Sequence, residues 1–212
     1  MSEQILDQSV QHFLDTLASA APTPGGGSVA ALTGAMAAGL LVMVCDLTIG
    51  KKAYAEFEAD AVALRERAEA TRQALQQLAQ DDIDVFERLS AAYRLPKAAD
   101  ADAATRRAAI QTVTRHATVV PLRMVRALAD LVPLCAPLAQ HSSRLAVSDV
   151  GVAAHLIRAA VPSALLNVDI NLAALEDQMF VRETRALVQD ITGGIDAELD
   201  RVIALVAERI RM

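Results

Sequence analysis

The chain has 212 residues, of which 53% are hydrophobic but only 3% aromatic. This length suits one domain, residues 1–212, and a core so poor in aromatics must use Ala, Leu, Val and Ile, which favours packed helices. The net charge of −6 argues against a nucleic-acid surface, which needs clustered positive charge. Cys45 and Cys135 lie in apolar runs without disulfide or metal spacing, which indicates core packing and a cytoplasmic location.

The first part of the chain predicts two helices. An amphipathic helix is expected over about residues 3–20, before Pro22. A nearly uncharged helix is expected over residues 29–45, with Ser28 as its cap. Its length and its Ala and Gly content favour a buried helix over a membrane span, and the absence of Lys or Arg before Lys51 argues against a secretory signal.

The middle of the chain predicts two long helices. The first covers about residues 54–93, with one apolar stripe, and ends at Leu95-Pro96. Asp102 is expected to cap the second. The prolines inside that helix should kink or break it, since each removes a backbone donor; they are Pro121, Pro133 and Pro137.

The last part predicts shorter helices. Ser148-Asp149 is expected to cap a helix through Ile157, and Pro162 to open or kink the next stretch. A final helix should cover residues 176–210, loosened at Gly193-Gly194. Because no stretch alternates apolar and polar residues, we expect an all-α multihelical bundle of about seven or eight helices, with the long apolar helix central.

The loop before the apolar helix reads Pro22-Thr-Pro-Gly-Gly-Gly-Ser28. A helix that starts at such a loop leaves backbone N–H groups free for an anionic or electron-rich ligand, although glycines also form plain turns. In the helix itself, Ala31, Ala35 and Gly39 repeat every four residues, which permits close approach of another backbone. A homodimer interface is one candidate use of this stripe.

Two residue types are scarce. Three Lys stand beside 17 Arg, and they are Lys51, Lys52 and Lys97. Lys carries a compact ammonium charge whose pKa can shift, so a functional site is one explanation for Lys at these positions. Ordinary solvation of charged residues in loops is the other explanation. Asn167 and Asn171 are the two asparagines, and their spacing puts both on one helix face. Their amides need partners, either in the protein or on a ligand.

The carboxylates give candidates for proton transfer. Asp82 lies in a cluster with Asp81 and Asp84, and we expect at least Asp81 to be a surface charge. Asp149 is a second candidate, although its position at a helix start also suits a helix cap. The histidines are dispersed without ligand spacing, which predicts no metal site. No phosphate-binding loop motif occurs either, so nucleotide binding is unsupported.

From about Phe13 to Phe180 the chain resembles the methenyltetrahydrofolate cyclohydrolase and formimidoyltetrahydrofolate cyclodeaminase family. Seven ordered motifs carry the resemblance and contain all three Lys and both Asn: Pro22 to Ser28, Met43 to Lys52, Asp82 with Phe86, Leu95 to Lys97, Val120 to Leu122, Ser148 to Ala154, and Asn167 to Leu172. It implies an all-α, dimer-forming fold, a folate substrate and no further cofactor, with no nucleic-acid or membrane partner.

The resemblance implies hydrolysis of 5,10-methenyltetrahydrofolate to 10-formyltetrahydrofolate. The first alternative is formimidoyltetrahydrofolate cyclodeaminase activity, which releases ammonia. The second alternative is a non-catalytic protein that binds folate or interacts with other proteins through its helices. The cyclohydrolase is favoured because the chain lacks a fused formimidoyltransferase domain and because residues 47–52 are similar to the free-standing cyclohydrolases.

The roles implied by the resemblance fall on residues of six of these motifs. Asp82 or Asp149 would act as base or hold the pterin, and Asn167 with Asn171 would bind the folate. Lys51, Lys52 and Lys97 would bind the glutamate tail or carry protons. The pocket would be lined by the backbone of Pro24, Gly25, Gly26, Gly27 and Ser28.

One departure concerns Ser142-Ser143, where the family usually has Gly-Asn. A Ser can forbid a left-handed backbone angle, and losing Asn removes a donor. Either the loop is remodelled or part of the site is missing, and the latter favours the non-catalytic alternative.

Overall fold

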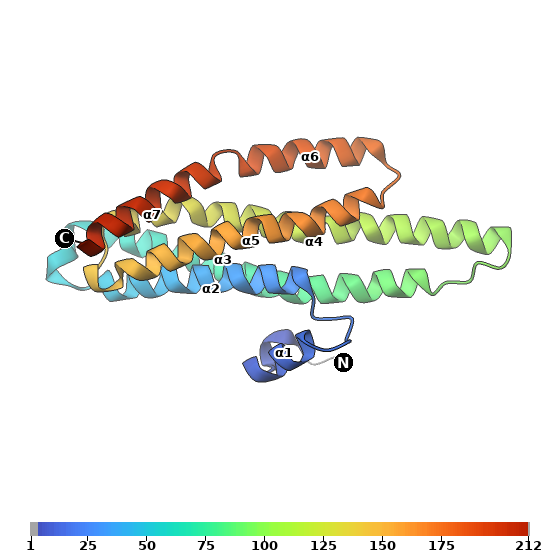
Figure 1. The fold of residues 1–212 in the computed structure, drawn as a ribbon, viewed down its shortest axis with the longest axis horizontal. Coiled ribbons are helices and arrows are strands. Elements are labelled where there is room, and N and C mark those ends of the chain that lie inside the picture. Colours follow the sequence, from blue (N-terminus) through green and yellow to red (C-terminus); the bar gives the residue numbers. More distant parts are fainter. Residues whose placement is uncertain (1–3, 212) are drawn as a thin grey trace.

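The computed structural model describes residues 4–211, which are helical and contain no strand (Figure 1). The all-α prediction is therefore confirmed. The helices are α1 (Val10–Leu17), α2 (Gly26–Thr48), α3 (Glu58–Tyr93), α4 (Asp100–His141), α5 (Val147–Ala173), α6 (Gln178–Thr192) and α7 (Ile195–Arg211), with 3-10 turns at Ile5–Asp7, Lys52–Phe57 and Arg144–Ala146.

Six long helices, α2 to α7, form the bundle, where we expected about seven or eight. The overestimate comes from the prolines. Pro121, Pro133 and Pro137 all lie inside the continuous helix α4, and Pro162 lies inside α5. A proline costs a helix one backbone bond, but both helices are packed along most of their length against neighbours, and that packing outweighs the local cost.

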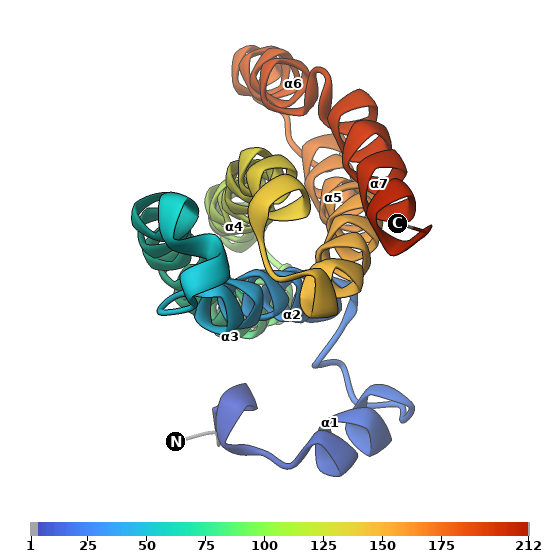
Figure 2. The same ribbon diagram turned by 90° about the vertical axis from the view of Figure 1, so that its left-hand side faces the viewer.

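The bundle is elongated, with α2, α3, α4 and α5 running lengthwise beside one another (Figure 1). The end-on view shows α2 between α3 and α5, with α4 on the other side and α6 and α7 on the outer edge (Figure 2). The paired helices α3 and α4 extend beyond the end of α5. Helix α1 stands apart from the bundle, and none of its residues is buried.

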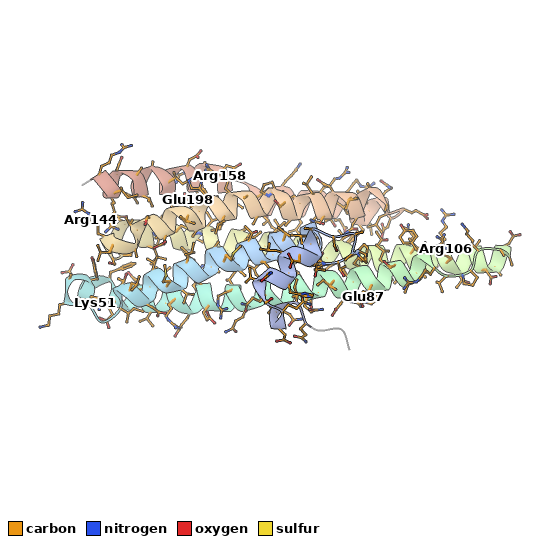
Figure 3. The ribbon with its side chains drawn as sticks, turned by 60° about the horizontal axis from the view of Figure 1, so that its bottom comes forward. Lys51, Glu87, Arg106, Arg144, Arg158 and Glu198 are labelled. Carbon is orange, nitrogen blue, oxygen red and sulfur yellow. The ribbon has the colours of Figure 1, made fainter. Side chains whose placement is uncertain are left out.

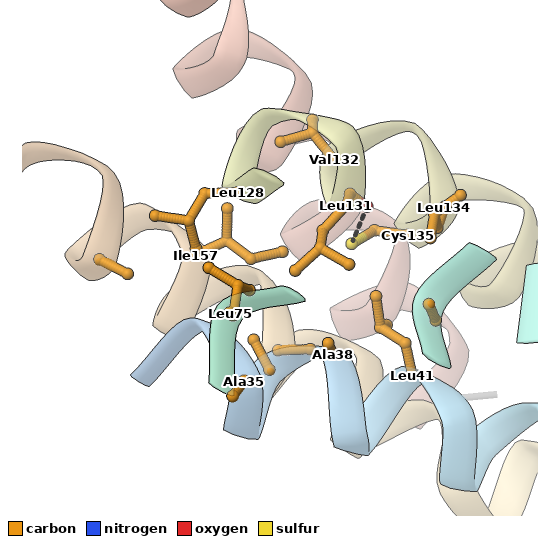
Figure 4. Close-up of a cluster of buried hydrophobic side chains, with 14 of the residues drawn as sticks. Ala35, Ala38, Leu41, Leu75, Leu128, Leu131, Val132, Leu134, Cys135 and Ile157 are labelled. Atoms are coloured by element: carbon orange, nitrogen blue, oxygen red, sulfur yellow. Dashed lines mark hydrogen bonds between the residues drawn. The ribbon is translucent and has the colours of Figure 1, made fainter. Parts of the chain in front are cut away.

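The core is aliphatic, as the composition predicted. Leu41 of α2, Leu75 of α3, Leu131 of α4 and Ile157 of α5 are fully buried in one core cluster (Figure 4). The small residues of α2 serve this packing: a Cβ added to Gly34 would lie 2.5 Å from Cδ2 of Leu128, and Ala31, Ala35 and Ala38 are buried. At Ala31 and Ala35 of the stripe, close approach therefore occurs within the chain, whereas Gly39 is half-buried.

Several predicted helix starts are wrong. Helix α2 begins at Gly26 with Gly25 as its cap, so Ser28 lies in the first turn. The hydroxyl of Ser28 donates to the Asp82 carboxylate and does not cap the helix. Helix α4 begins before Asp102, with Ala99 as its cap. Ser148 and Asp149 lie inside the first turn of α5, which continues to Ala173 rather than ending near Ile157.

Two other helix boundaries lie at glycines. Gly50 follows the end of α2 with φ of +73°, a backbone angle that glycine adopts at little cost. The expected loosening of the last helix is a full break, because Gly194 has φ of +86° and separates α6 from α7. The first helix is shorter than predicted, and residue 3 of that prediction lies outside the described residues.

Two segments, Gly26–Thr48 and Arg144–Ala173, are long and apolar enough to cross a membrane by length and composition. In the apolar windows of these segments, 56% and 50% of the residues are buried inside the fold, the pattern of core helices.

Candidate functional site

A pocket of about 400 Å³ opens where α2 begins. The loop after α1 and the start of α2 form one wall, the middle of α3 forms another, and α4 with the second half of α5 closes it. Its lining comprises Pro22, Thr23, Gly25, Gly26, Gly27, Asp82, Val85, Phe86, Leu89, Tyr93, Thr114, Ala117, Asn167, Ile170, Asn171 and Ala174. We call it the α2 pocket.

Asp82 is the one charged side chain in this lining. Its Oδ2 atom accepts a hydrogen bond from the hydroxyl of Ser28 over 3.1 Å, and the backbone N–H of Ser28 also donates to the carboxylate. The carboxylate lies so close to α2 that a Cβ atom on Gly27 would overlap it. Gly27 is therefore required for this close approach.

The environment of Asp82 makes it a base stronger than an exposed aspartate. Burial raises the pKa of the Asp82 carboxyl, and the two hydrogen bonds from Ser28 lower it by a smaller amount. The carboxylate also faces the first turn of α2, where backbone N–H groups are unpaired and the helix dipole favours negative charge. A buried carboxyl with a raised pKa in a pocket is a common arrangement for proton transfer.

Asn167 and Asn171 lie one turn apart on α5, and both line the α2 pocket. The Nδ2 group of Asn167 donates to the backbone oxygen of Ser163 over 3.0 Å, and that of Asn171 donates to the backbone oxygen of Ala117 over 2.8 Å. Each amide thus keeps its oxygen as an acceptor for a ligand. The structure places this pair in one pocket with Asp82 and the glycines of residues 25–27.

Thr114 was missed by the sequence reasoning. It is 1% exposed, it lines the α2 pocket, and its Oγ1 atom has no hydrogen-bond partner among the described residues. A buried hydroxyl normally finds a partner, so a polar group of a ligand is a reasonable one for Thr114. A threonine within a long helix carries no sequence signal for this, because helical threonines usually bond their own backbone.

Phe86 and Tyr93 of α3 and Ile170 of α5 form the exposed apolar rim of the pocket. An apolar rim around a few polar groups is typical of a small-molecule site and suits a flat aromatic ligand. Only Phe86 of these three was singled out from the sequence, through its motif with Asp82.

The remaining predicted residues lie elsewhere. Lys51 and Lys52 follow the far end of α2, and Asp149 is in the first turn of α5 at that same end. Figure 3 shows Lys51 beside Arg144 at one end of the bundle, with Glu87 and Arg106 toward the other. Asp149 and Asn167 are separated by about 27 Å of helix. One copy of the chain does not bring these residues into the α2 pocket.

Two other predicted residues flank the pocket. Pro24 follows a cis peptide bond and lines a small adjoining cavity of about 170 Å³ with Thr23, not the α2 pocket itself. Lys97 lies in the exposed loop between α3 and α4, beyond Tyr93. The roles predicted for these two residues, and for the three at the far end, stay predictions.

The Ser142-Ser143 departure also lies at the far end. Both residues are buried and have ordinary negative φ values of −73° and −53°, so a left-handed angle is not needed there. The N–H of Ser143 donates to the hydroxyl of Thr48, and Arg209 donates to the backbone oxygen of Ser142. Both bonds use backbone atoms of the two serines, and the residues that line the α2 pocket do not include this loop.

Other candidate chemistries find little support among residues 4–211. Burial raises the pKa of Cys45 to about 11 and that of Cys135 to about 12, so both thiols stay protonated and act as core residues. The described part of the chain contains no group of three or more potential metal ligands.

Comparisons with known proteins agree with the motifs. The family model described as formiminotransferase-cyclodeaminase matches residues 9–190. Methenyltetrahydrofolate cyclohydrolase of Methylorubrum extorquens is 39% identical over 204 residues, which cover 96% of this chain and 98% of that protein. Formimidoyltransferase-cyclodeaminase of Rattus norvegicus is 31% identical over 189 residues, and the match spans only 35% of its length.

A solved structure shares the fold over nearly the whole chain. The crystal structure of formiminotetrahydrofolate cyclodeaminase from Thermotoga maritima superimposes with a TM-score of 0.79 at 28% identity, covering 98% of both chains.

Proposed function

Because the chain belongs to the formiminotransferase-cyclodeaminase family, we propose that it hydrolyses 5,10-methenyltetrahydrofolate to 10-formyltetrahydrofolate in the α2 pocket. The similarity to a methenyltetrahydrofolate cyclohydrolase extends over 98% of that protein, which favours this reaction within the family. The observation that carries the proposal is Asp82, a half-buried carboxylate with a raised pKa among neutral polar groups.

The reaction needs a base beside a cationic carbon. Asp82 removes a proton from water while the water oxygen bonds to the methenyl carbon and the C=N π electrons move to nitrogen. The carbon becomes tetrahedral, and the positive charge is lost. The bond from this carbon to N5 then breaks, N5 receives the proton held by Asp82, and the hydroxyl releases its proton to become the formyl oxygen. No electron is transferred, so we propose no cofactor beyond the folate.

The neutral polar groups suit the pterin ring. The amide oxygens of Asn167 and Asn171 and the hydroxyl of Thr114 offer acceptors and a donor on the α4–α5 side of the pocket. The backbone of residues 25–27 lines the side next to Asp82. In this arrangement the pterin lies toward α4 and α5, and the carbon between N5 and N10 lies at Asp82.

A second candidate is the cyclodeaminase reaction, which the likeness to the Thermotoga maritima structure favours. There N10 attacks the carbon of the protonated formimino group, and the C=N π electrons move to the formimino nitrogen. Asp82 takes the N10 proton and passes it to that nitrogen, which leaves as ammonia while the cationic methenyl bridge forms. The same base at the same carbon serves both reactions because both pass through a tetrahedral carbon between two nitrogens.

The two reactions are separated by their substrates. Purified protein is mixed with methenyltetrahydrofolate, and loss of its near-ultraviolet absorbance is compared with the spontaneous rate. In parallel, formiminotetrahydrofolate is supplied and ammonia release is measured. Accelerated hydrolysis without ammonia release supports the cyclohydrolase. Ammonia release alone identifies the cyclodeaminase, and folate binding without either reaction indicates the non-catalytic alternative.

We also propose a homodimer that works in the cytoplasm. Val10 of α1 is 76% exposed, and Leu14 beside it is exposed, although α1 is strongly amphipathic. The outer faces of α2 and α5 are likewise apolar, with Met36 and Leu166 exposed. A second copy of the chain that packs its α1 on the α2 face would cover both surfaces, which a monomer rarely leaves open.

An antiparallel two-fold arrangement would also bring Lys51, Lys52 and Asp149 of the partner copy toward the α2 pocket. Light scattering should then give about twice the chain mass of 22.5 kDa. Val10→Asp should yield monomers. Mixing Asp82→Asn copies with Asp149→Asn copies should restore activity that each lacks alone. A monomeric wild-type protein, or full activity of Asp149→Asn, contradicts this arrangement.

A further inference from the structure

Pro121 of α4 belongs to one of the motifs that carry the family resemblance, and the proposed reaction gives it no role. It is buried inside the continuous helix. Because a proline has no backbone N–H, the carbonyl four residues earlier in a helix loses its usual partner, and the proline ring also presses against that carbonyl. In α4 the carbonyl concerned is that of Ala117, a residue that lines the α2 pocket. Pro121 therefore leaves a backbone acceptor at the wall of the site.

A side chain of another helix binds this acceptor. The Nδ2 group of Asn171 on α5 donates to the Ala117 oxygen over 2.8 Å, in a partly buried bond between residues 54 positions apart. A backbone N–H at position 121 would compete for the same oxygen, since it would close the ordinary bond of the helix. This contact between α4 and the second half of α5 thus depends on a residue that cannot donate.

This bond fixes the orientation of the Asn171 amide. A carbonyl oxygen can only accept, so the NH2 group of the side chain faces Ala117, and the amide oxygen stays available as an acceptor. Asn167 has the same arrangement one turn earlier, because its Nδ2 group donates to the backbone oxygen of Ser163 over 3.0 Å. The α5 wall of the pocket therefore offers two acceptor oxygens, from residues about 6 Å apart along the helix.

We infer that Pro121 is a positioning residue for the substrate: it frees the Ala117 carbonyl, and that carbonyl holds the Asn171 amide as an acceptor. The inference rests on the proposed folate substrate. Two acceptors on one wall select a ring edge that carries donors, and the pterin of a tetrahydrofolate carries its amino group and ring N–H groups along such an edge. With an N–H at position 121, the Asn171 amide would lose its partner and would be free to turn its NH2 group toward those donors, which weakens binding.

The first test observes the amide without a ligand. Asn167 and Asn171 are the two asparagines of the chain, so ¹⁵N-asparagine labelling gives one side-chain NMR signal pair for each, and Asn167→Leu assigns them. Pro121→Ala should shift the Asn171 pair and speed the solvent exchange of its NH2 protons about fivefold, the worth of one hydrogen bond, and should leave the Asn167 pair in place. Pro121→Val restores the same N–H with more apolar bulk and should act alike. Pro133→Ala is the matched control, because Pro133 lies in the same helix outside the pocket lining.

The second test measures tetrahydrofolate binding by calorimetry. Pro121→Ala and Pro121→Val should each raise the Kd about fivefold, and the KM for methenyltetrahydrofolate should rise by a similar factor while kcat changes little, because Asp82 stays in place. Asn171→Leu should abolish this effect: adding Pro121→Ala to it should cause no further loss of affinity, since the proline acts through that amide.

The outcomes separate the inference from the proposed function. Unaltered Asn171 signals in Pro121→Ala, a further loss of affinity in the double variant, or an effect of Pro121→Ala that Pro121→Val does not share overturns the role of Pro121. A wild-type chain that binds tetrahydrofolate without hydrolysing methenyltetrahydrofolate overturns only the proposed reaction. If the wild-type chain binds no folate, the folate substrate is overturned, and the amide signals still decide whether Pro121 orients Asn171.

Discussion

The hydroxyl of Ser28 lies 3.1 Å from Oδ2 of Asp82 and donates a hydrogen bond to it, joining the first turn of α2 to the middle of α3. Ser28 is fully buried, and its hydroxyl also lies 3.3 Å from the backbone oxygen of Ala79. The pair sets the proton affinity of the proposed base: burial raises the pKa of Asp82, and the bonds from Ser28 lower it.

The pH dependence of catalysis should follow this balance. Since the ionised carboxylate is the base, kcat/KM should rise with pH through the raised pKa of Asp82, above the range of an exposed aspartate. Ser28→Ala removes a hydrogen bond to the ionised Asp82 carboxylate, so it should shift the rising limb of the kcat/KM profile to higher pH. Thr33→Ala is the control, because that hydroxyl donates to its own helix at Val29. A limb that Ser28→Ala leaves in place would argue against Asp82 as the base.

Stability should respond to Asp82 in the opposite sense to most carboxylates. A pKa raised by folding means that the folded chain holds the proton more tightly. The resulting stability is full below the unfolded pKa and is lost as the pH rises through the folded pKa. Asp82→Asn should therefore gain melting temperature relative to wild type as the pH rises through this window. The exposed Asp130→Asn should show no such trend, and a constant difference for Asp82→Asn contradicts the sign.

Gly27 should tolerate no side chain. Ala at this position would overlap the Asp82 carboxylate, an overpacking that costs about 1–3 kcal/mol against a helix-propensity gain of about 1 kcal/mol. Displacing the base should also lower kcat more than tenfold, about 1.4 kcal/mol in the barrier. Gly39→Ala is matched on the same helix, because its nearest neighbour would be Arg72 Cδ at 3.7 Å. Equal effects of the two changes in denaturation and turnover would contradict this geometry.

Thr114 should matter for binding and not for folding. Thr114→Val removes a buried hydroxyl that has no partner among the described residues, so the melting temperature should be unchanged or higher. If the hydroxyl bonds the pterin, the KM should rise about fivefold, corresponding to a net hydrogen bond of about 1 kcal/mol. Thr118→Val, one turn along α4, loses a bond to the backbone of Thr114 and should lower stability without changing KM. An unaltered KM for Thr114→Val removes Thr114 from the site.

Much of the α2 pocket could be predicted because its residues carry local signals. The glycine loop breaks and starts a helix whatever surrounds it, and the spacing of Asn167 and Asn171 fixes a common helix face. Asp82 was one of several aspartates in a cluster, and only the tertiary contact with Ser28 and Gly27 distinguishes it from Asp81, which faces Arg123.

What the sequence left open depends on contacts between distant helices. The continuity of α4 through Pro121 reflects packing that no local rule contains. Thr114 became a candidate only because its usual helical bond is not made. Lys51 and Asp149 belong to the same ordered set of motifs as the pocket residues, yet the antiparallel course of α2 and α5 places them at the other end of the bundle.

The most direct test of the account is single-turnover hydrolysis of methenyltetrahydrofolate by Asp82→Asn, with folate affinity measured on the same preparation. Removing the general base should lower the rate by about 10²- to 10⁴-fold, while the affinity stays within about threefold of wild type because the neutral residues hold the pterin. Hydrolysis by Asp82→Asn at the wild-type rate, with folate still bound, would contradict the account.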